Sequence, residues 1–281
     1  MRRALALAAV LPLAACGGRT PQPASAPTPA ARPTAPAEPR SLQYGADNGR
    51  YRIEAQTHIV QEMMGQTQDR NSTLLLDFTA ALTPAAGNVA AAITIDSIAV
   101  DAATEAAGDI QSARGRTYRA VYTPAGRAVS LTSPDTANVV VVQMGETFRE
   151  FLPALPPAPI AAGMAWTDTV NSTLSPAPGL VMRSQSVRQH HVVGWEDHGG
   201  VRALHISTTG AFTISGEGEQ SGQQLQVSGR GSTSLERFIS ATGVYLGQTG
   251  SDSTNLTVSV VSAGIEIPIR QVRHSTVTRL P

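Results

Sequence analysis

The sequence predicts a mainly β protein: a strongly curved, half-barrel-like antiparallel sheet with one covering helix near residues 135–152. Three observations lead to this fold class. Apolar and polar residues alternate in many short runs, glycine-containing turn signals separate the runs, and a single segment carries apolar residues at helical spacing. A period of two places the apolar side chains on one face of a sheet and leaves the other face wetter, an arrangement that antiparallel sheets tolerate.

The predicted strands follow one another along the body of the chain. In the first, Tyr51 and Ile53 alternate with Arg52 and Glu54. The same alternation predicts further strands around residues 74–79, 93–95, 204–206, 212–214, 225–227, 256–260 and 265–269. These runs are rich in Val, Ile, Leu and Thr, which fit the pleated, half-buried surface of a strand.

Candidate turns contain glycine, which adopts a positive φ without steric cost. They lie at residues 47–49, 124–126, 198–200, 228–231, 247–250 and 262–264. Strand runs separated at intervals of roughly ten residues favour a meander of hairpins.

One segment departs from the alternation. Ser133 and Pro134 fit a helix N-cap followed by proline at the first helical position. Apolar residues then recur at helical spacing as far as Phe151, and Pro153 ends the run. The sequence therefore predicts a helix near 135–152 that lies on the concave face of the sheet, although the four valines at 139–142 would equally suit a strand.

A proline-rich connector near residues 153–159 divides the body into two unequal β-rich parts. The first part offers few strands, and its helix needs a sheet to cover. We therefore expect residues 42–281 to form a single domain in two parts, with two separate domains as the alternative.

Residues 1–15 have the features of a secretory signal peptide. A positive Met1-Arg2-Arg3 start precedes an apolar run up to Leu13 that is too short to cross a bilayer as a stable helix. Small residues then precede Cys16, the single cysteine of the chain.

The segment Leu13-Ala14-Ala15-Cys16 resembles the lipobox of bacterial lipoproteins. The resemblance implies cleavage before Cys16 and acylation of this residue, for example by palmitate. Two or three chains would anchor the protein stably, since each buried CH₂ contributes about 0.8 kcal/mol. Gly17 stands where Asp favours the inner membrane in that family, so the resemblance implies an outer-membrane anchor facing the periplasm or the cell surface. The alternative is an ordinary signal peptide with a chance cysteine.

Residues 16–41 would then be the lipidated cysteine and a disordered tether. Pro and Ala dominate this segment, and its few bulky apolar side chains cannot offset the entropy of ordering. An extended proline-rich spacer reaches about 3.1 Å per residue and could hold the body off the membrane.

The stretch from Phe148 to Asp168 resembles part of an uncharacterised family of β-rich bacterial envelope lipoproteins. It contains Leu-Pro-Ala-Leu-Pro-Pro, followed by Pro-Ile-Ala-Ala-Gly-Met-Ala-Trp-Thr-Asp. The family supplies no catalytic residues. A lipid tether on a β-rich body is also similar, at the level of the fold alone, to half-barrel lipoprotein carriers that hold acyl chains in a cavity.

No catalytic residue and no cofactor are predicted. The chain has one cysteine and no lysine, which excludes internal disulfides, cysteine-based zinc clusters and Schiff-base lysines. Nucleophile-elbow, zinc-protease and phosphate-loop motifs are missing from the sequence, while a triad assembled in space stays open. The formal net charge of zero gives no indication of nucleic acid as a partner.

The densest set of possible metal ligands lies at residues 190–198. Zinc needs three or four converging ligands. His190 and His191 point to opposite faces of a strand, so that only one of them could join His198. We predict no metal site, with His191 and His198 as the weak candidates. Glu146 and Glu150 are expected on one solvent face of the helix.

The sequence thus predicts a membrane-anchored envelope lipoprotein that binds a lipid or another apolar ligand between sheet and helix. The candidate ligand contacts are Phe148, Phe151 and Trp166. The alternative is a structural or protein-binding lipoprotein with a solid core, and a hydrolase is a third possibility. Nothing in the sequence identifies a protein partner.

Overall fold

The computed structural model describes residues 38, 41–63, 65–101, 110–177, 179–220 and 222–281. They belong to one compact unit, Glu38–Pro281. Cys16, the signal peptide and nearly all of the tether lie outside the described residues.

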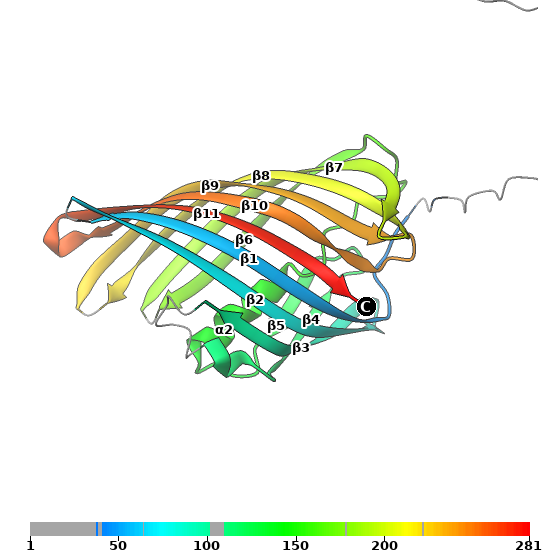
Figure 1. The fold of residues 1–281 in the computed structure, drawn as a ribbon, viewed down its shortest axis with the longest axis horizontal. Coiled ribbons are helices and arrows are strands. Elements are labelled where there is room, and N and C mark those ends of the chain that lie inside the picture. The colour runs from blue at the N-terminus through cyan, green and yellow to red at the C-terminus, as the bar shows by residue number, and fades with distance from the viewer. Residues whose placement is uncertain (1–37, 39–40, 64, 102–109, 178, 221) are drawn as a thin grey trace, which may run out of the picture. The chain divides into compact units, whose positions relative to one another are not determined.

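The described strands form one antiparallel sheet of eleven strands (Figure 1). Its order is β5-β4-β3-β2-β1-β11-β10-β9-β8-β7-β6. The bounds are β1 (Asp47–Met63), β2 (Gln66–Ala85), β3 (Asn88–Val100), β4 (Thr117–Tyr122), β5 (Ala128–Thr132), β6 (Ala165–Ala177), β7 (Leu180–His198), β8 (Val201–Gln220), β9 (Gln223–Ser240), β10 (Tyr245–Val260) and β11 (Ile265–Leu280). Consecutive strands pair within β1–β5 and within β6–β11, whereas β5 and β6 are the two open edges of the sheet.

The predicted fold class is confirmed. The sheet arches over the α-helix α2 (Val139–Arg149) (Figure 1). The described residues also form two short 3-10 helices, η1 (Gln111–Ala113) and η2 (Val261–Ala263). The strands before and after the proline-rich connector belong to the same sheet. They meet where β1 pairs with β11, from Arg50 opposite Leu280 to Gln61 opposite Ile269.

The strands are longer than the sequence runs indicated, and three of the six predicted turns are wrong. Turns form at 124–126 and 198–200, and at the end of 262–264, but residues 47–49, 228–231 and 247–250 lie within β1, β9 and β10. Glycine serves a different purpose in β9. A Cβ atom on Gly231 would lie 2.3 Å from Cζ of Phe212, so this glycine makes room for a large neighbour on the adjacent strand.

The helix begins later than predicted. Asn138 is the N-cap instead of Ser133, and its side-chain oxygen accepts hydrogen bonds from the backbone N–H groups of Val140 (3.0 Å) and Val141 (3.2 Å). The side chain of Asp135 forms the turn before the cap, accepting from the N–H of Ala137 at 3.0 Å. The valines therefore start the helix, because the cap satisfies backbone donors that a strand would have had to pair.

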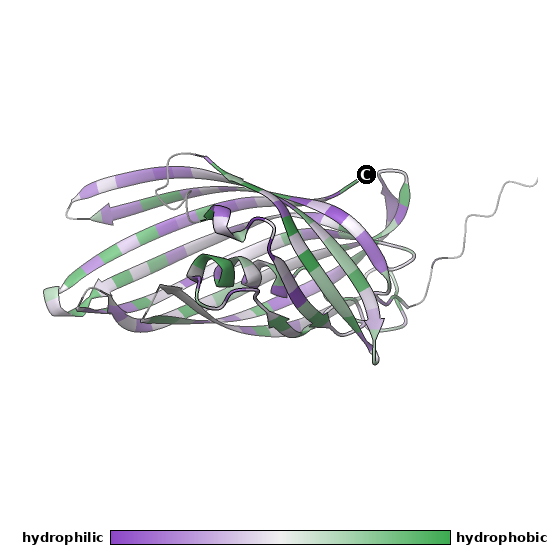
Figure 2. Ribbon diagram, turned by 90° about the horizontal axis from the view of Figure 1, so that it is seen from below, coloured by the Kyte–Doolittle hydropathy of each residue, from purple (hydrophilic) through white to green (hydrophobic). Residues whose placement is uncertain are grey.

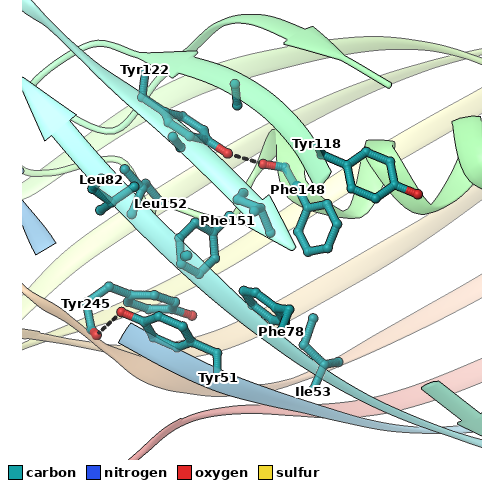
Figure 3. Close-up of a cluster of buried hydrophobic side chains, with 14 of the residues drawn as sticks. Tyr51, Ile53, Phe78, Leu82, Tyr118, Tyr122, Phe148, Phe151, Leu152 and Tyr245 are labelled. Atoms are coloured by element: carbon teal, nitrogen blue, oxygen red, sulfur yellow. Dashed lines mark hydrogen bonds between the residues drawn. The ribbon is translucent and has the colours of Figure 1, made fainter. Parts of the chain in front are cut away.

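An aromatic core fixes α2 beneath the sheet (Figure 3). Phe148, in the last turn of the helix, and Phe151, just after the helix, pack on Phe78 with ring centroids 5.2 and 5.4 Å away. The hydroxyl of Tyr118 donates to the carbonyl oxygen of Val141 at 2.9 Å, and that of Tyr122 donates to the carbonyl oxygen of Phe148. The first and last turns of the helix are thus each bonded to β4.

Candidate ligand cavity

A cavity of about 660 Å³ lies between α2 and the concave face of the sheet. Its volume is within the range of small-molecule sites, roughly 300–1,000 Å³. Phe148 and Phe151 contribute to its lining, as expected from the sequence. Trp166 lies elsewhere, stacked on His190 with a centroid distance of 4.7 Å.

The lining of this cavity is mixed. The apolar part of the lining, called the apolar wall below, consists of Ile53, Val142, Phe148, Phe151, Leu235, Tyr245 and Val277. All of these except Val142 and Leu235 belong to the aromatic core or pack against it. The remaining lining is polar or charged, and it comes from α2 with its C-cap Glu150 and from β6, β7, β9, β10 and β11. The cavity lies between sheet and helix, where the sequence predicted an apolar ligand site, and its lining combines apolar and charged side chains.

Ion pairs occupy the polar wall. Nε of Arg149 lies 2.6 Å from Oε2 of Glu146, and Nη1 of Arg188 lies 2.9 Å from Oε2 of Glu150. Both glutamates line the cavity, although the sequence placed them on a solvent face of the helix. Each of these two arginines therefore has a carboxylate partner.

Arg237 differs from its neighbours because its described hydrogen-bond partners are neutral. It is only 4% exposed. Its Nε donates to Oε1 of Gln248 at 3.1 Å, and its Nη1 donates weakly to Oγ1 of Thr208 at 3.4 Å. Within the described part of the chain, no carboxylate oxygen lies within 4.0 Å of the guanidinium nitrogens of Arg237, the distance limit of an ion pair. Burial lowers the pKa of Arg237, and the positive charge of Arg188 lowers it as well. The guanidinium nevertheless stays protonated, because the ordinary pKa of arginine lies far above neutral pH.

A smaller cavity of about 280 Å³ adjoins the first. The two share four lining residues: Arg149, Glu150, Arg188 and Arg237. The smaller cavity is also lined by Asp168 and His190, on the inner face of β6 and β7, and by the start of the proline-rich connector.

Asp168, His190 and Thr208 are neighbours on β6, β7 and β8. Nδ1 of His190 lies 2.9 Å from Oγ1 of Thr208, while its Nε2 lies 3.2 Å from Oδ1 of Asp168 without the alignment of a hydrogen bond. His190 is 1% exposed, and burial lowers its pKa, which favours the neutral imidazole. The order hydroxyl, imidazole, carboxylate is that of a nucleophilic triad. Thr208, however, is fully buried and lines neither cavity, so its hydroxyl is not presented to a bound molecule.

The two weak metal candidates do not come together with other ligands. His191 is exposed on the outer face of β7, opposite in direction to buried His190. His198 stacks on Phe238 with a centroid distance of 3.9 Å. Among the described residues, no three His, Cys, Asp or Glu side chains are grouped so that they could hold a metal ion.

Sequence reasoning missed Arg237, yet the sequence carries a signal for it. Arg237 alternates with Leu235 and Ile239, which are 8% and 0% exposed, so it occupies an inner-face position of β9. A charged residue in register with buried apolar neighbours indicates a charge directed into the interior.

The helix α2 contacts β4, β5 and β6. Apolar side chains continue along the inner face of the sheet beyond this helix. Bands of apolar and polar residues alternate along the strands in Figure 2. The inner-face residues of this part are Phe212, Ile214, Val227, Leu256, Val258, Ile267 and Ile269, and all but Val227 are partly exposed. The outer face opposite them carries mainly Ser, Thr, Gln and Arg.

None of the helices in the described ranges combines the length and the apolar character needed to span a membrane.

No protein-family model and no curated protein matches this chain. Solved structures give only distant similarities. OccK2 (OpdF) of Pseudomonas aeruginosa in complex with glucuronate is 9% identical, with 84% of this chain and 100% of that chain covered and a TM-score of 0.26. OccK11 (OpdR) of the same organism is 9% identical, covering 85% and 99%, with a TM-score of 0.23. OmpTdeltaL8, a loop L8 deletion mutant of OmpT, an outer membrane protein of Vibrio cholerae, is 7% identical, covering 84% and 100%, with a TM-score of 0.18. Similarity at this level carries no conclusion about function.

Proposed function

We propose that this chain is a lipid-anchored protein of the bacterial cell envelope that binds an amphiphilic small molecule between α2 and the sheet. The observation that carries the proposal is the 660 Å³ cavity, whose lining contains both apolar and charged side chains. Such a lining suits a ligand with an apolar body and a polar end, because each part finds matching groups. Anchoring through Cys16 rests on the lipobox at residues 13–16.

The packing around the cavity supports binding by a preformed site. Tyr118 and Tyr122 bond to the two ends of α2, and Phe148 is completely buried beneath the sheet. Ligand binding would therefore cost little conformational entropy for ordering the site, which favours affinity. A long apolar chain could extend from the cavity onto the inner face around Leu256 and Ile269, which are partly exposed.

Filling the cavity should weaken the binding of neutral amphiphilic probes. We expect the mature chain, residues 16–281 with Cys16→Ser so that no detergent is needed, to bind N-phenyl-1-naphthylamine with a rise in fluorescence and to release it to 1-dodecanol. Val142→Trp, which places a large ring in the cavity, should weaken both affinities at least about tenfold, equivalent to roughly 1.4 kcal/mol. Val129→Trp on edge strand β5, where the side chain is 58% exposed, is the matched control. Absence of probe binding to the unaltered cavity would overturn the proposed function.

The anchor is tested separately in cells. Cys16→Ser should leave an unprocessed precursor without acyl mass, since the thiol that would be acylated is lost. Ser25→Ala, in the tether, should be processed and lipidated normally. A Cys16→Ser variant that still matures and stays membrane-bound would rule out this anchor.

A further inference from the structure

The buried guanidinium of Arg237 is a charge that the described residues leave without a counter-ion. A buried charge is costly unless it is paired and hydrogen-bonded. The other two arginines of the shared wall, Arg149 and Arg188, each have a carboxylate at 2.6–2.9 Å, whereas Arg237 has only Gln248 and Thr208. A bound anion would pair with this charge.

The surrounding charges do not supply this anion. Glu150 lines the same wall, but Arg188 holds both of its oxygens, at 2.9 and 3.0 Å. Asp168, whose Oδ1 lies 3.2 Å from Nε2 of His190, and Asp252, which lines the larger cavity, form no ion pair with Arg237 either. The positive charge of Arg188 lowers the pKa of Arg237, and the negative charge of Glu150 raises it. Among the described residues, none of these carboxylates is an ion-pair partner of the guanidinium, so a bound anion could be one.

Arg237 is also placed where a bound molecule would meet it, because it lines both cavities. The apolar wall of the larger cavity begins beside it. Tyr245 and Leu235 flank the guanidinium along β10 and β9, and Val277 of β11 is the neighbour of its partner Gln248. A single molecule can therefore contact the cation with one end and the apolar wall with the rest.

We infer that the ligand is an acidic amphiphile whose carboxylate or phosphate binds Arg237, while its apolar chain lies against Ile53, Phe151 and Val277. This inference rests on the proposed function and names the chemical class of its ligand. A guanidinium offers parallel N–H donors that suit either oxyanion, and a charge-assisted bond in a site with little water is stronger than a neutral one.

Probes of one chain length separate the contribution of the head group from that of the chain. On the mature chain with Cys16→Ser, dodecanoate should displace N-phenyl-1-naphthylamine at least about tenfold more effectively than 1-dodecanol, as expected for a hydrogen bond to a charged group. Dodecyltrimethylammonium, with a positive head, should be weaker than 1-dodecanol. Inorganic phosphate at the same concentration should leave the fluorescent probe bound, because it lacks the chain.

A pair of arginine variants locates the head group. Arg237→Met should remove the preference for dodecanoate and leave the affinity for 1-dodecanol within about twofold, since a well-packed apolar side chain often replaces a buried charge without loss of stability. Arg270→Met, at an exposed outer-face position of β11, should keep the preference. Arg237→Lys, which retains the positive charge, should keep part of the preference for dodecanoate. This variant tests the proposal if the methionine variant fails to fold.

The outcomes distinguish the two levels of the proposal. Equal affinities for dodecanoate and 1-dodecanol would overturn the acidic head group and leave the proposed function standing. A preference that survives Arg237→Met in a folded protein would place the anion elsewhere. Displacement of the fluorescent probe by inorganic phosphate as effectively as by dodecanoate would show a site for free anions in place of an amphiphile. Failure of every amphiphile to bind would overturn the proposed function itself.

Discussion

Replacing Phe148 by alanine is expected to lower the free energy of unfolding by about 3–5 kcal/mol, the range for a large aromatic side chain in a packed core. Phe148 is fully buried. Its ring lies 5.2 Å from the rings of both Phe78 and Tyr118, measured between centroids. The alanine variant would leave a void at the contact between α2 and the sheet, because the helix is bonded to β4 at both ends and cannot collapse into it.

Denaturant unfolding followed by circular dichroism measures this loss. Val129→Ala on the exposed edge strand β5 should change the stability by less than about 0.5 kcal/mol and is the control for a shortened side chain on the surface. A loss below about 1 kcal/mol for Phe148→Ala would mean that the aromatic core does not fix the helix.

At alkaline pH, we expect the protein to unfold in the same transition in which its tyrosines lose their protons. All five tyrosines of the chain are buried: Tyr44, Tyr51, Tyr118, Tyr122 and Tyr245. Burial raises the pKa of each above its ordinary value of 10.0, and that of Tyr118 to about 12. In the unfolded chain these groups lose their protons near pH 10. The folded state therefore binds more protons above that pH, so the stabilisation is fully present below pH 10 and is lost as the pH rises.

The ultraviolet absorbance of tyrosinate, recorded with circular dichroism, tests this expectation. The folded protein should show little tyrosinate just above pH 10, and the absorbance should then rise in one step that coincides with loss of the β signal. In concentrated guanidinium chloride the same residues should titrate smoothly near their ordinary pKa. A smooth titration near pH 10 with an unchanged dichroism spectrum would contradict the burial of the tyrosines.

The fold class follows from the sequence because period-two alternation is maintained over most of the body. Tyr51 and Ile53 lie inside, Arg52 and Glu54 lie outside or partly so, and the same holds for the later runs. The alternation depends on local residues alone, and antiparallel neighbours need only short turns. The helix centre was predictable for the same reason, from the spacing of Val141, Met144 and Phe148.

Glycine misled the turn prediction because it has two physical uses. At Gly199 and Gly200 it adopts a positive φ in a turn, at 61° and 82°. At Gly229 and Gly231 it lies within β9, where a Cβ atom would meet Leu256 at 2.4 Å and Phe212 at 2.3 Å. The second use depends on which strand lies opposite, and a single sequence does not contain that register.

The candidate site was only partly predictable. Phe148 and Phe151 were accessible to sequence reasoning because a helix over a sheet must bury its apolar face. The charged wall was not, since Arg149, Arg188 and Arg237 come from one helix and two strands that only the sheet order brings together. Charged inner-face positions such as Arg237 are the signal to examine in similar sheets.

The location of a bound amphiphile tests the central claim most directly. A dodecanoic acid that carries a photoreactive diazirine on its chain should, after irradiation, label residues of α2 and inner-face positions of β1, β9, β10 and β11 that line the cavity. Excess dodecanoate should suppress the labelling, and Val142→Trp should reduce it. Labels confined to the outer face of the sheet, or labelling that excess dodecanoate leaves unchanged, would contradict a ligand site between the helix and the sheet.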